Sequence, residues 1–566
     1  PAAMHGLQRQ VPRSASPTRL AARAMTIRLY WRAIGRLPWV VRHKPQTFSM
    51  NATAAQNGST GRLLGFFIVL LALSYGLLKF AVGLDQGQPG ATFQLWLFSS
   101  IIAFLGTVIY WLFQQKEHPR GLYLLFFTEM WERFSYYGMR GILTLYLSKT
   151  ALEGGLGFAK EDATVIYGWF TGLVYLTPII GGWLADTYIG QRRAILIGGV
   201  LMMLGQFSLA SGMGPGSAYL GFALIIIGNG FFKPNISTIV GQLYPQGDPR
   251  RDSAFTIFYM GINLGAFLAP LVCGYFAEDL FAVKAEDGTI TKYAFEYGFL
   301  AAGCGMLLGQ VIFNSLAKRY LGDIGVQPAK KNKSDAEAHA EANRPLTKQE
   351  TDRMAVIFTI TVFVTFFWAG FEQAGSSLTL YTDEYVNRTV FGWTIPTSFF
   401  QSVNPLFIVL LGAPIAAIWL RLAKKGKDWS IPVKMGLGML LLGVGFLFML
   451  GAVIERGGEN ADPTVKAALS WLLLTYFFHT VGELCLSPIG LSMITKLAPV
   501  KFASMLMGVW FLSPFVAQII GGYIAAYVEK LGAFMVFGLI AGFVMAAGLV
   551  MFLISRKLVT MMHGRG

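Results

Sequence analysis

The chain has 566 residues, of which 54% are hydrophobic and only 13% are charged. Soluble proteins carry about 25% charged residues, so this composition excludes an ordinary water-soluble domain. The formal net charge of +16 raises the alternative of nucleic-acid binding, but from Met50 onward Lys and Arg gather in alternate loops between apolar stretches, which is the positive-inside pattern of membrane proteins.

The first segment, residues 1–61, is a basic N-terminal extension that we expect to be disordered. Its first part is rich in Lys and Arg and has no Asp or Glu, a composition similar to that of an organellar transit peptide. The chain opens with Pro1, and Met4, Met25 and Met50 are candidate start sites. We therefore expect this tract to lie outside the folded protein.

Apolar stretches follow, each long enough to cross a membrane, which takes about 20 residues. Two lie in residues 62–115 and are expected to be accessory transmembrane helices. Six lie in residues 116–317 and six in residues 353–558. Residues 318–352 are too polar to cross and are expected to be a cytoplasmic linker, and residues 559–566 a cytoplasmic tail. The expected fold is all-α: a polytopic membrane protein with two six-helix bundles and two extra N-terminal helices, both termini being cytoplasmic.

The two sets of six share a motif in their fourth spans, which favours an internal repeat. At equal offsets the motif contains Gly228, Pro234, Leu243 and Pro245 in the first set and Gly482, Pro488, Leu497 and Pro499 in the second. Two related halves of six spans are typical of a transporter that works by alternating access.

The first span of the first set carries a polar stripe. It consists of Glu129, Glu132, Arg133, Tyr136, Tyr137 and Arg140, whose spacing places them on one helical face. An ionisable side chain at the bilayer centre costs about 2.5 to 3.5 kcal/mol, so such residues normally face a partner or a water-filled cavity. A buried ion-pair network that only fixes helix packing is the alternative. We favour a conduction pathway.

Counting residues from the ends of the spans predicts two ion pairs between the halves. Arg140 and Glu372 both lie about 30 Å from the cytoplasmic side, at a rise of about 1.5 Å per residue. Lys233 and Glu483 both lie past the middle of the membrane. Each pair has one member in each half, so alternate making and breaking would open opposite ends of a cavity. We expect both pairs to be gates.

Four motifs resemble those of the proton-coupled oligopeptide transporters of the major facilitator superfamily. EMWERFSYYG is similar to the family's ExxERFxYYG signature, and the other three are GGWLADTYIGQRR, FTIFYMGINLGAFLAP and GELCLSPIGLS. The resemblance covers roughly residues 120–555. It implies the major facilitator fold and import of di- and tripeptides, with protons as the coupling ion and no cofactor or metal.

The resemblance also implies roles for individual residues. Proton coupling would involve Glu129, Glu132, Arg133, Lys233 and Glu372. Glu483 would bind the amino terminus of a peptide, and Arg140 and Lys233 its carboxylate. The pocket would be completed by Tyr136, Tyr137, Tyr175, Trp368, Asn404, Ser487 and Trp510. Charged groups that bind only the peptide termini would leave varied side chains to tolerant aromatic walls.

Two features differ from mammalian members, and we expect a bacterial-type protein of the inner membrane. We also expect it to function as a monomer. The stretch from Tyr167 to Phe170 lacks the histidine that mammalian members carry there, so carboxylates would carry the protons. The loop from Glu455 to Lys466 is short, whereas mammalian members insert a large domain. For His479 in the tenth core span we expect packing or hydrogen bonding rather than proton transfer.

Three alternatives to a peptide transporter are considered: a transporter of another solute, a receptor and an enzyme. A transporter of the same superfamily could carry nitrate or an amino acid, although the ExxERF face favours peptides. A peptide-sensing receptor would bind without translocating. An intramembrane enzyme would need a nucleophile with a base, or a metal cluster, and the spans contain no HExxH, GxSxG or paired Asp motif. We therefore do not expect an enzyme.

Overall fold

A computed structural model describes residues 51–80, 90–114, 117–245, 248, 250–286, 288–328, 345–499 and 502–564. Most of the basic N-terminal extension and the middle of the polar linker lie outside the described residues. Helices dominate the described part, with two small antiparallel hairpins. The chain divides into two compact units.

The smaller unit holds most of α2 (Asn51–Phe80) and the later part of α3 (Ala91–Gln114). Within it the two helices pack through the stacked rings of Phe66 and Tyr110, whose centroids are 4.3 Å apart. The hydroxyl of Ser74 donates to the Ser99 carbonyl at 3.1 Å. Helix α2 begins at Asn51, so the helix starts inside the tract that the sequence analysis assigned to the extension.

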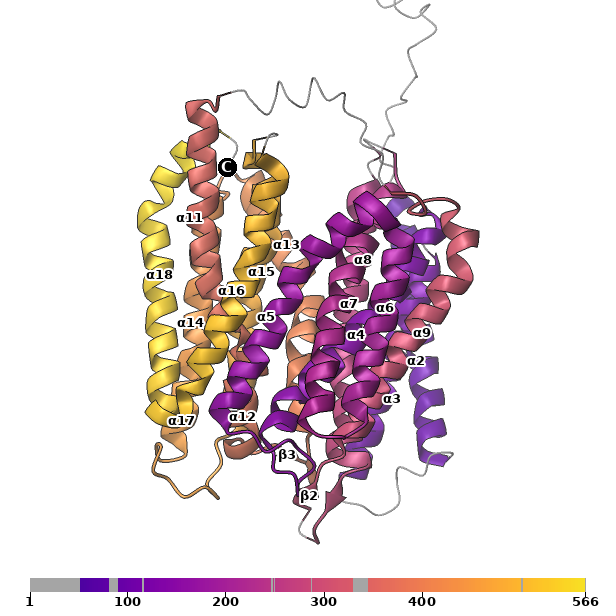
Figure 1. The fold of residues 1–566 in the computed structure, drawn as a ribbon, viewed down its shortest axis with the longest axis vertical. Helices are drawn as coiled ribbons and strands as arrows, with labels where there is room; N and C mark the ends of the chain where they lie inside the picture. The colour runs from indigo at the N-terminus through magenta and orange to yellow at the C-terminus, as the bar shows by residue number, and fades with distance from the viewer. Residues whose placement is uncertain are drawn as a thin grey trace, which may run out of the picture. The chain divides into compact units, whose positions relative to one another are not determined.

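The larger unit contains two sets of six long helices (Figure 1). The first set is α4 (Arg120–Ser148), α5 (Lys160–Leu184), α6 (Gln191–Ala210), α7 (Pro215–Gln242), α8 (Arg250–Tyr275) and α9 (Phe295–Leu321). Short π-helical segments extend two of these helices, and a hairpin joins the last two. These elements are η1 (Ala185–Ile189), η2 (Phe276–Leu280), β1 (Val283–Lys284) and β2 (Ile290–Lys292).

The second set begins after the linker. Its long helices are α11 (Lys348–Phe371), α13 (Val403–Lys424), α14 (Ile431–Glu455), α15 (Leu469–Leu497), α16 (Ala503–Ala526) and α18 (Ala533–Met561). Short elements connect them. They are η3 (Glu372–Gly375), α12 (Ser377–Tyr385), β3 (Thr389–Val390), β4 (Trp393–Thr394), η4 (Thr397–Ser402) and α17 (Val528–Leu531). The prediction of two six-helix bundles with two extra N-terminal helices is confirmed.

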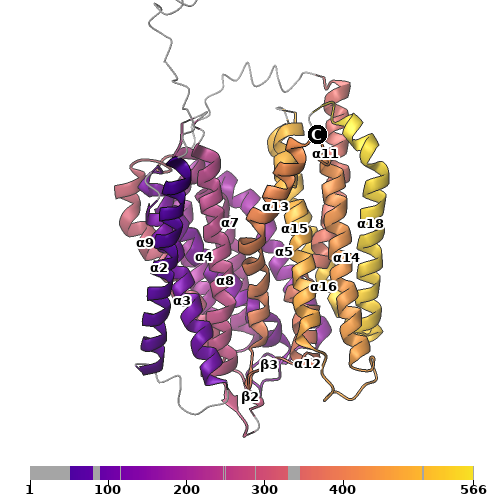
Figure 2. The same cartoon turned by 180° about the vertical axis from the view of Figure 1, so that it is seen from behind.

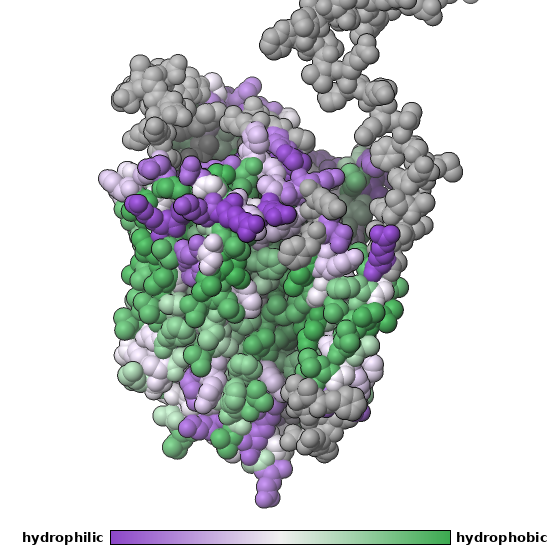
Figure 3. All heavy atoms as spheres, turned by 90° about the vertical axis from the view of Figure 1, so that its right-hand side faces the viewer, coloured by the Kyte–Doolittle hydropathy of each residue, from purple (hydrophilic) through white to green (hydrophobic). Residues whose placement is uncertain are grey.

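Thirteen helices in the described residues are long and apolar enough to cross a membrane, judged by length and composition. Helix α4 is outside this set because its stripe adds too many charges. On the face drawn in Figure 3, hydrophobic side chains form a middle band and hydrophilic ones gather toward the ends. This is the surface pattern that a bilayer requires.

The two halves meet along helices from both sets. Helix α5 lies beside α16 (Figure 1), and α8 lies beside α13 (Figure 2). We call the end of the larger unit where α9 ends and α11 begins the linker end, and the other end the opposite end. A cavity that the halves enclose can therefore be closed or opened at either end by changing these contacts.

Candidate functional site

A cavity of about 190 Å³ lies between the two halves, and we call it the central cavity. Its walls come from α4, α5 and α8 of the first half and from α11, α13 and α15 of the second. Seven predicted site residues line it: Tyr137, Arg140, Tyr175, Trp368, Glu372, Asn404 and Glu483. Residues far apart in the sequence therefore meet at one site, as the polar stripe of α4 predicts.

A second cavity of about 190 Å³, which we call the side cavity, adjoins the first. Tyr175 and Trp368 line both cavities. The side cavity also holds Lys233, Ser487 and Trp510, the remaining predicted pocket residues apart from Tyr136. Together the two cavities present six tyrosine or tryptophan rings and charges of both signs.

Tyr136 was also predicted to line the pocket, but it lines neither of the two cavities described above, and its role there stays a prediction. Only 2% of Tyr136 is exposed, and it packs in the hydrophobic core of the first half, where its hydroxyl has no hydrogen-bond partner among the described residues. Tyr137, the next residue, lines the central cavity instead. Adjacent residues on a helix differ by about 100°, so one faces the cavity while the other faces its own bundle.

The acids and the base at the start of the stripe form one buried cluster. The Nε atom of Arg133 lies 2.8 Å from Glu129 Oε1 and 2.7 Å from Glu132 Oε2. The side-chain amide of Asn229 on α7 donates to Glu132 Oε1 at 3.2 Å. Two carboxylates therefore share one guanidinium in an environment that water barely reaches.

Arg140 and Glu372 form a buried ion pair between the halves. Arg140 also donates from Nε to the hydroxyl of Tyr167 at 2.6 Å. One turn further along α4, the Thr144 hydroxyl donates to the carbonyl of Gly375 at 2.5 Å. The pairing expected from the depth estimate is present, on the side of the cavity nearer the opposite end. Its role as a gate stays a prediction.

The second expected pair is not formed in this structure. Lys233 lies with its ammonium 4.4 Å from the ring centroid of Tyr175 and makes no ion pair with a carboxylate in the described part of the chain. Glu483 accepts a hydrogen bond from Asn404 at 2.9 Å and is likewise unpaired among the described residues. The two residues line different cavities, so equal depth along the spans does not bring them together in this conformation.

Charged contacts that the sequence analysis missed join the halves at the opposite end. Lys149 lies 2.7 Å from Asp383, and Lys160 lies 2.7 Å from Glu384 and 3.1 Å from Glu529. These residues sit at or near helix ends that connect to loops. Sequence offers no signal for these pairs, because it does not show which loops of the two halves meet.

Glu278 supplies a further contact between the halves. Although it is 2% exposed, its carboxylate accepts hydrogen bonds from the backbone amides of Thr397 at 2.6 Å and Ser398 at 3.1 Å. Ser402 donates from its hydroxyl to the carbonyl of Phe267 at 2.7 Å. With the ion pairs above, these bonds close the opposite end of the molecule.

Several polar residues of the central cavity were not predicted as ligands. They are Tyr259, Asn263, Gln401, Tyr476 and His479. Their polar side chains within apolar spans were the sequence signal that could have identified them. His479 packs against Phe446 with ring centroids 4.7 Å apart, which agrees with the packing role expected for it.

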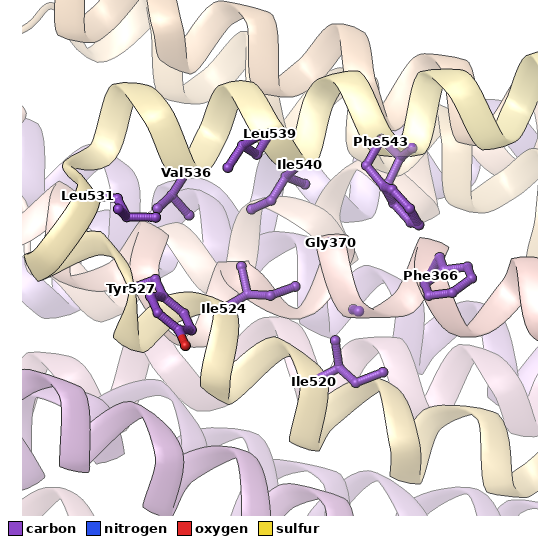
Figure 4. Close-up of a pocket in the computed structure, with 12 residues that line it drawn as sticks. Phe366, Gly370, Ile520, Ile524, Tyr527, Leu531, Val536, Leu539, Ile540 and Phe543 are labelled. Carbon is purple, nitrogen blue, oxygen red and sulfur yellow. The ribbon is translucent and has the colours of Figure 1, made fainter.

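A larger cavity of about 390 Å³ lies between α11, α16 and α18, and Figure 4 shows its lining. The side chains are apolar except for Tyr527. A zwitterionic ligand would lose its hydration there without gaining a charged partner, so this cavity does not suit a peptide. Within the described residues, no group of three or more His, Cys, Asp or Glu side chains could hold a metal ion.

Comparisons with known proteins assign these features to a family. The profile of the POT family (PTR2) matches residues 192–322 and 318–538. The chain is 34% identical to "Peptide transporter YePEPT" of Yersinia enterocolitica subsp. palearctica serotype O:3 (strain YE-P4), over 73% of this chain and 88% of that protein. It is also 34% identical to "Di-/tripeptide transporter" of Lactococcus lactis subsp. cremoris, over 78% and 96%.

Solved structures agree with these relatives. A crystal structure of a mutant of peptide transporter POT in complex with alafosfalin matches with a TM-score of 0.70 and 37% sequence identity. The match covers 80% of this chain and 97% of that one. The resemblance of the four sequence motifs therefore extends to the whole bundle of twelve core helices.

Proposed function

Because the chain belongs to the POT family, we propose that it imports di- and tripeptides together with protons across a bacterial inner membrane. The relatives described above support this substrate class, since one is named a peptide transporter and the other a di-/tripeptide transporter. The helices and the family make the chain a multi-pass membrane protein. Both termini are cytoplasmic in this proposal, with the linker end facing the cytoplasm.

The observation that carries the proposal is the pair of uncompensated charges in adjoining cavities. Glu483 is a carboxylate without a cation, and Lys233 is an ammonium without a carboxylate, among the described residues. Uncompensated charges within a membrane protein are costly, so each is retained for a ligand of opposite charge. A peptide with a charged amino terminus and a charged carboxylate supplies both ligands.

The walls between these charges suit variable peptides. Tyr175 and Trp368 border both cavities, and Asn404 holds Glu483 in place by a hydrogen bond. Aromatic rings accept many side chains by contact, whereas the two charges define the ends of the ligand. The site takes residues from both halves of one chain, so a monomer is sufficient for binding.

The closed contacts at the opposite end support an inward-facing transport state. The Arg140–Glu372 pair and the outer pairs of Lys149 and Lys160 hold the halves together there. On the other side of the site, Lys233 and Glu483 are apart. Release of the contacts at the opposite end, with formation of a Lys233–Glu483 pair, would turn the site toward the outside.

Protons enter the cycle at the cluster of Glu129, Glu132 and Arg133. A proton on either carboxylate removes one of the two negative charges that hold the guanidinium. The charge of Lys233 acts on the same cluster. Protonation therefore changes how strongly Lys233 is held by the protein, which links its availability to a substrate carboxylate with proton binding.

Uptake of a labelled dipeptide into proteoliposomes tests the proposal. An inside-alkaline pH gradient should drive accumulation above the level reached without a gradient. Unlabelled tripeptide should compete, whereas nitrate and single amino acids should not. Dipeptide binding without flux would identify a receptor, and competition by amino acids alone would identify another substrate class, so either result would overturn the proposal.

A further inference from the structure

The turn that joins α13 to α14 carries a dense positive charge. Arg421 and Lys424 lie in the last turn of α13, and Lys425 and Lys427 follow directly. All four side chains are exposed, and none forms an ion pair with a carboxylate in the described ranges. We call these four residues the basic turn. Their charges are available to a ligand outside the chain.

The backbone of the basic turn is held by hydrogen bonds. Gly426 has a φ of 66°, and its amide donates to the carbonyl of Ala423 at 3.0 Å. The amide of Lys427 donates to the carbonyl of Leu422 at 2.9 Å. This is the Schellman arrangement, in which glycine takes the left-handed position after the helix end. The charges are therefore presented by an ordered helix terminus.

Two tryptophans lie beside the basic turn. The rings of Trp419 and Trp429 are 5.9 Å apart, and the Lys434 ammonium lies 5.1 Å from the centroid of Trp419. Lys434 is paired with Asp428 at 2.7 Å. The indole N–H of Trp419 is buried and has no hydrogen-bond partner among the described residues. Buried donors normally have a partner, and the part of the chain that the structure describes supplies none for this N–H.

An apolar surface on α13 extends to the basic turn and the two tryptophans. Of the residues of α13, only Pro405 is buried. Val409, Leu410, Ile418 and Leu420 are 40% to 57% exposed. In a membrane protein such a surface faces acyl chains, whereas tryptophans near its end lie at the level of the headgroups. Acyl-chain contact and positive charge therefore occur together at one place.

We propose that the basic turn and the Trp419–Trp429 pair bind the headgroup of an anionic phospholipid whose acyl chains lie along α13. Its phosphate oxygens would compensate the four basic side chains, and a rotation of the Trp419 ring would allow its indole N–H to donate to them. Clusters of Lys and Arg directly beside a membrane span attract anionic lipids by about 1 kcal/mol per residue. A soluble phosphate would use the charges but gain nothing from the apolar surface.

Lipid retention by the purified full-length protein tests this site. The protein is incubated in detergent with equimolar phosphatidylglycerol and phosphatidylcholine, and native mass spectrometry gives the ratio of bound lipids. The variant K424Q/K425Q should lower the preference for phosphatidylglycerol by on the order of tenfold. The matched control is K318Q/R319Q, which removes two exposed charges from the last turn of α9, and it should keep the preference.

A third variant and a competitor complete the test. Trp419→Phe keeps the ring but removes the N–H, and it should lower the same preference without loss of the folded protein. Inorganic phosphate in large excess should leave the bound lipid in place. Equal losses in the two double variants, an unchanged ratio in K424Q/K425Q, or displacement by phosphate would each overturn the proposal.

Discussion

Glu483 illustrates how a single side chain defines what the site can bind. It is 8% exposed, lines the central cavity and receives one hydrogen bond, from Asn404. An amide in place of the carboxylate would keep the shape and the hydrogen-bonding capacity but lose the charge. The change therefore separates recognition of an ammonium from general packing in the cavity.

We predict that Glu483→Gln weakens binding of peptides by about 10- to 100-fold, because a hydrogen bond to a charged group contributes about 1.5 to 3 kcal/mol. Binding of analogues without the amino-terminal charge should change much less. Competition binding with both ligand types measures the difference. Equal losses for the two ligand types would refute the assigned role.

At the scale of single residues, the sequence predicted many of the residues that line the cavities, but not all of them. Thirteen of the fourteen predicted residues line one of the two cavities or belong to the cluster of Glu129, Glu132 and Arg133, whereas several other lining residues were not predicted. Periodicity and charge within apolar spans indicated the stripe of α4 and the charged residues, whereas the resemblance to the family supplied Tyr175, Trp368, Asn404, Ser487 and Trp510. Periodicity does not separate Tyr136 from Tyr137, because it defines a helical face only coarsely and the boundary between cavity and bundle core crosses that face.

At the scale of the elements, an ion pair between α4 and η3 joins the two halves. Arg140 on α4 pairs with Glu372 on η3, and Tyr167 on α5 supports the arginine. Helix counting could place Arg140 and Glu372 at one depth, because the rise of a helix is constant. It could not predict whether Lys233 and Glu483 are paired, since that depends on which conformation the two halves adopt.

We predict that Arg140→Gln and Glu372→Gln each weaken closure of the opposite end. Removing one partner of a buried ion pair costs about 3 to 5 kcal/mol, because the other charge is left uncompensated. A cysteine introduced at buried Thr144, one turn beyond Arg140 on α4, should react faster with an impermeant reagent in both variants. Unchanged reaction rates in both variants would remove the gate from the mechanism.

A close helix crossing gives an independent prediction. A Cβ atom at Gly168 on α5 would lie 2.7 Å from the carbonyl oxygen of Gln518 and 2.9 Å from the Cα of Gly522, both on α16. Backbone atoms cannot rotate away as a side chain does. Gly168→Ala should therefore separate the helices and destabilise the closed opposite end by about 1 to 3 kcal/mol.

The matched control for this crossing is Gly182→Ala on the same helix. A Cβ atom there would lie 3.4 Å from the side chain of Pro234, an ordinary contact within the first half. Cysteine accessibility at the opposite end should rise for Gly168→Ala and stay unchanged for Gly182→Ala. The same accessibility in both variants would show that the crossing does not limit closure.

For the whole molecule, function requires that the cavities, the contacts between halves and the proton-binding cluster respond to one another. The cluster of Glu129, Glu132 and Arg133 lies on α4, which also carries Arg140 of the opposite-end pair. Lys233, which borders the side cavity, acts electrostatically on Glu132. In the proposed cycle, a change of charge at Glu132 would therefore act on Lys233 and on the helix that carries Arg140.

The last prediction concerns this coupling. Glu132 shares Arg133 with Glu129, so its charged and neutral states hold the guanidinium differently. A glutamine mimics the neutral state but cannot bind and release a proton. We predict that Glu132→Gln abolishes accumulation of a labelled dipeptide against its gradient while exchange across a membrane without a pH gradient remains measurable.

Both measurements use the same proteoliposomes, so exchange is the control for folding and insertion of the variant. Exchange needs only binding and reorientation of the loaded site, whereas accumulation needs a proton to enter on one side and leave on the other. A variant that still concentrates the dipeptide under an imposed pH gradient would show that Glu132 is not the coupling residue. The cluster would then have a structural role, in which the ion pairs of Arg133 stabilise α4 and the Asn229–Glu132 hydrogen bond joins α4 to α7.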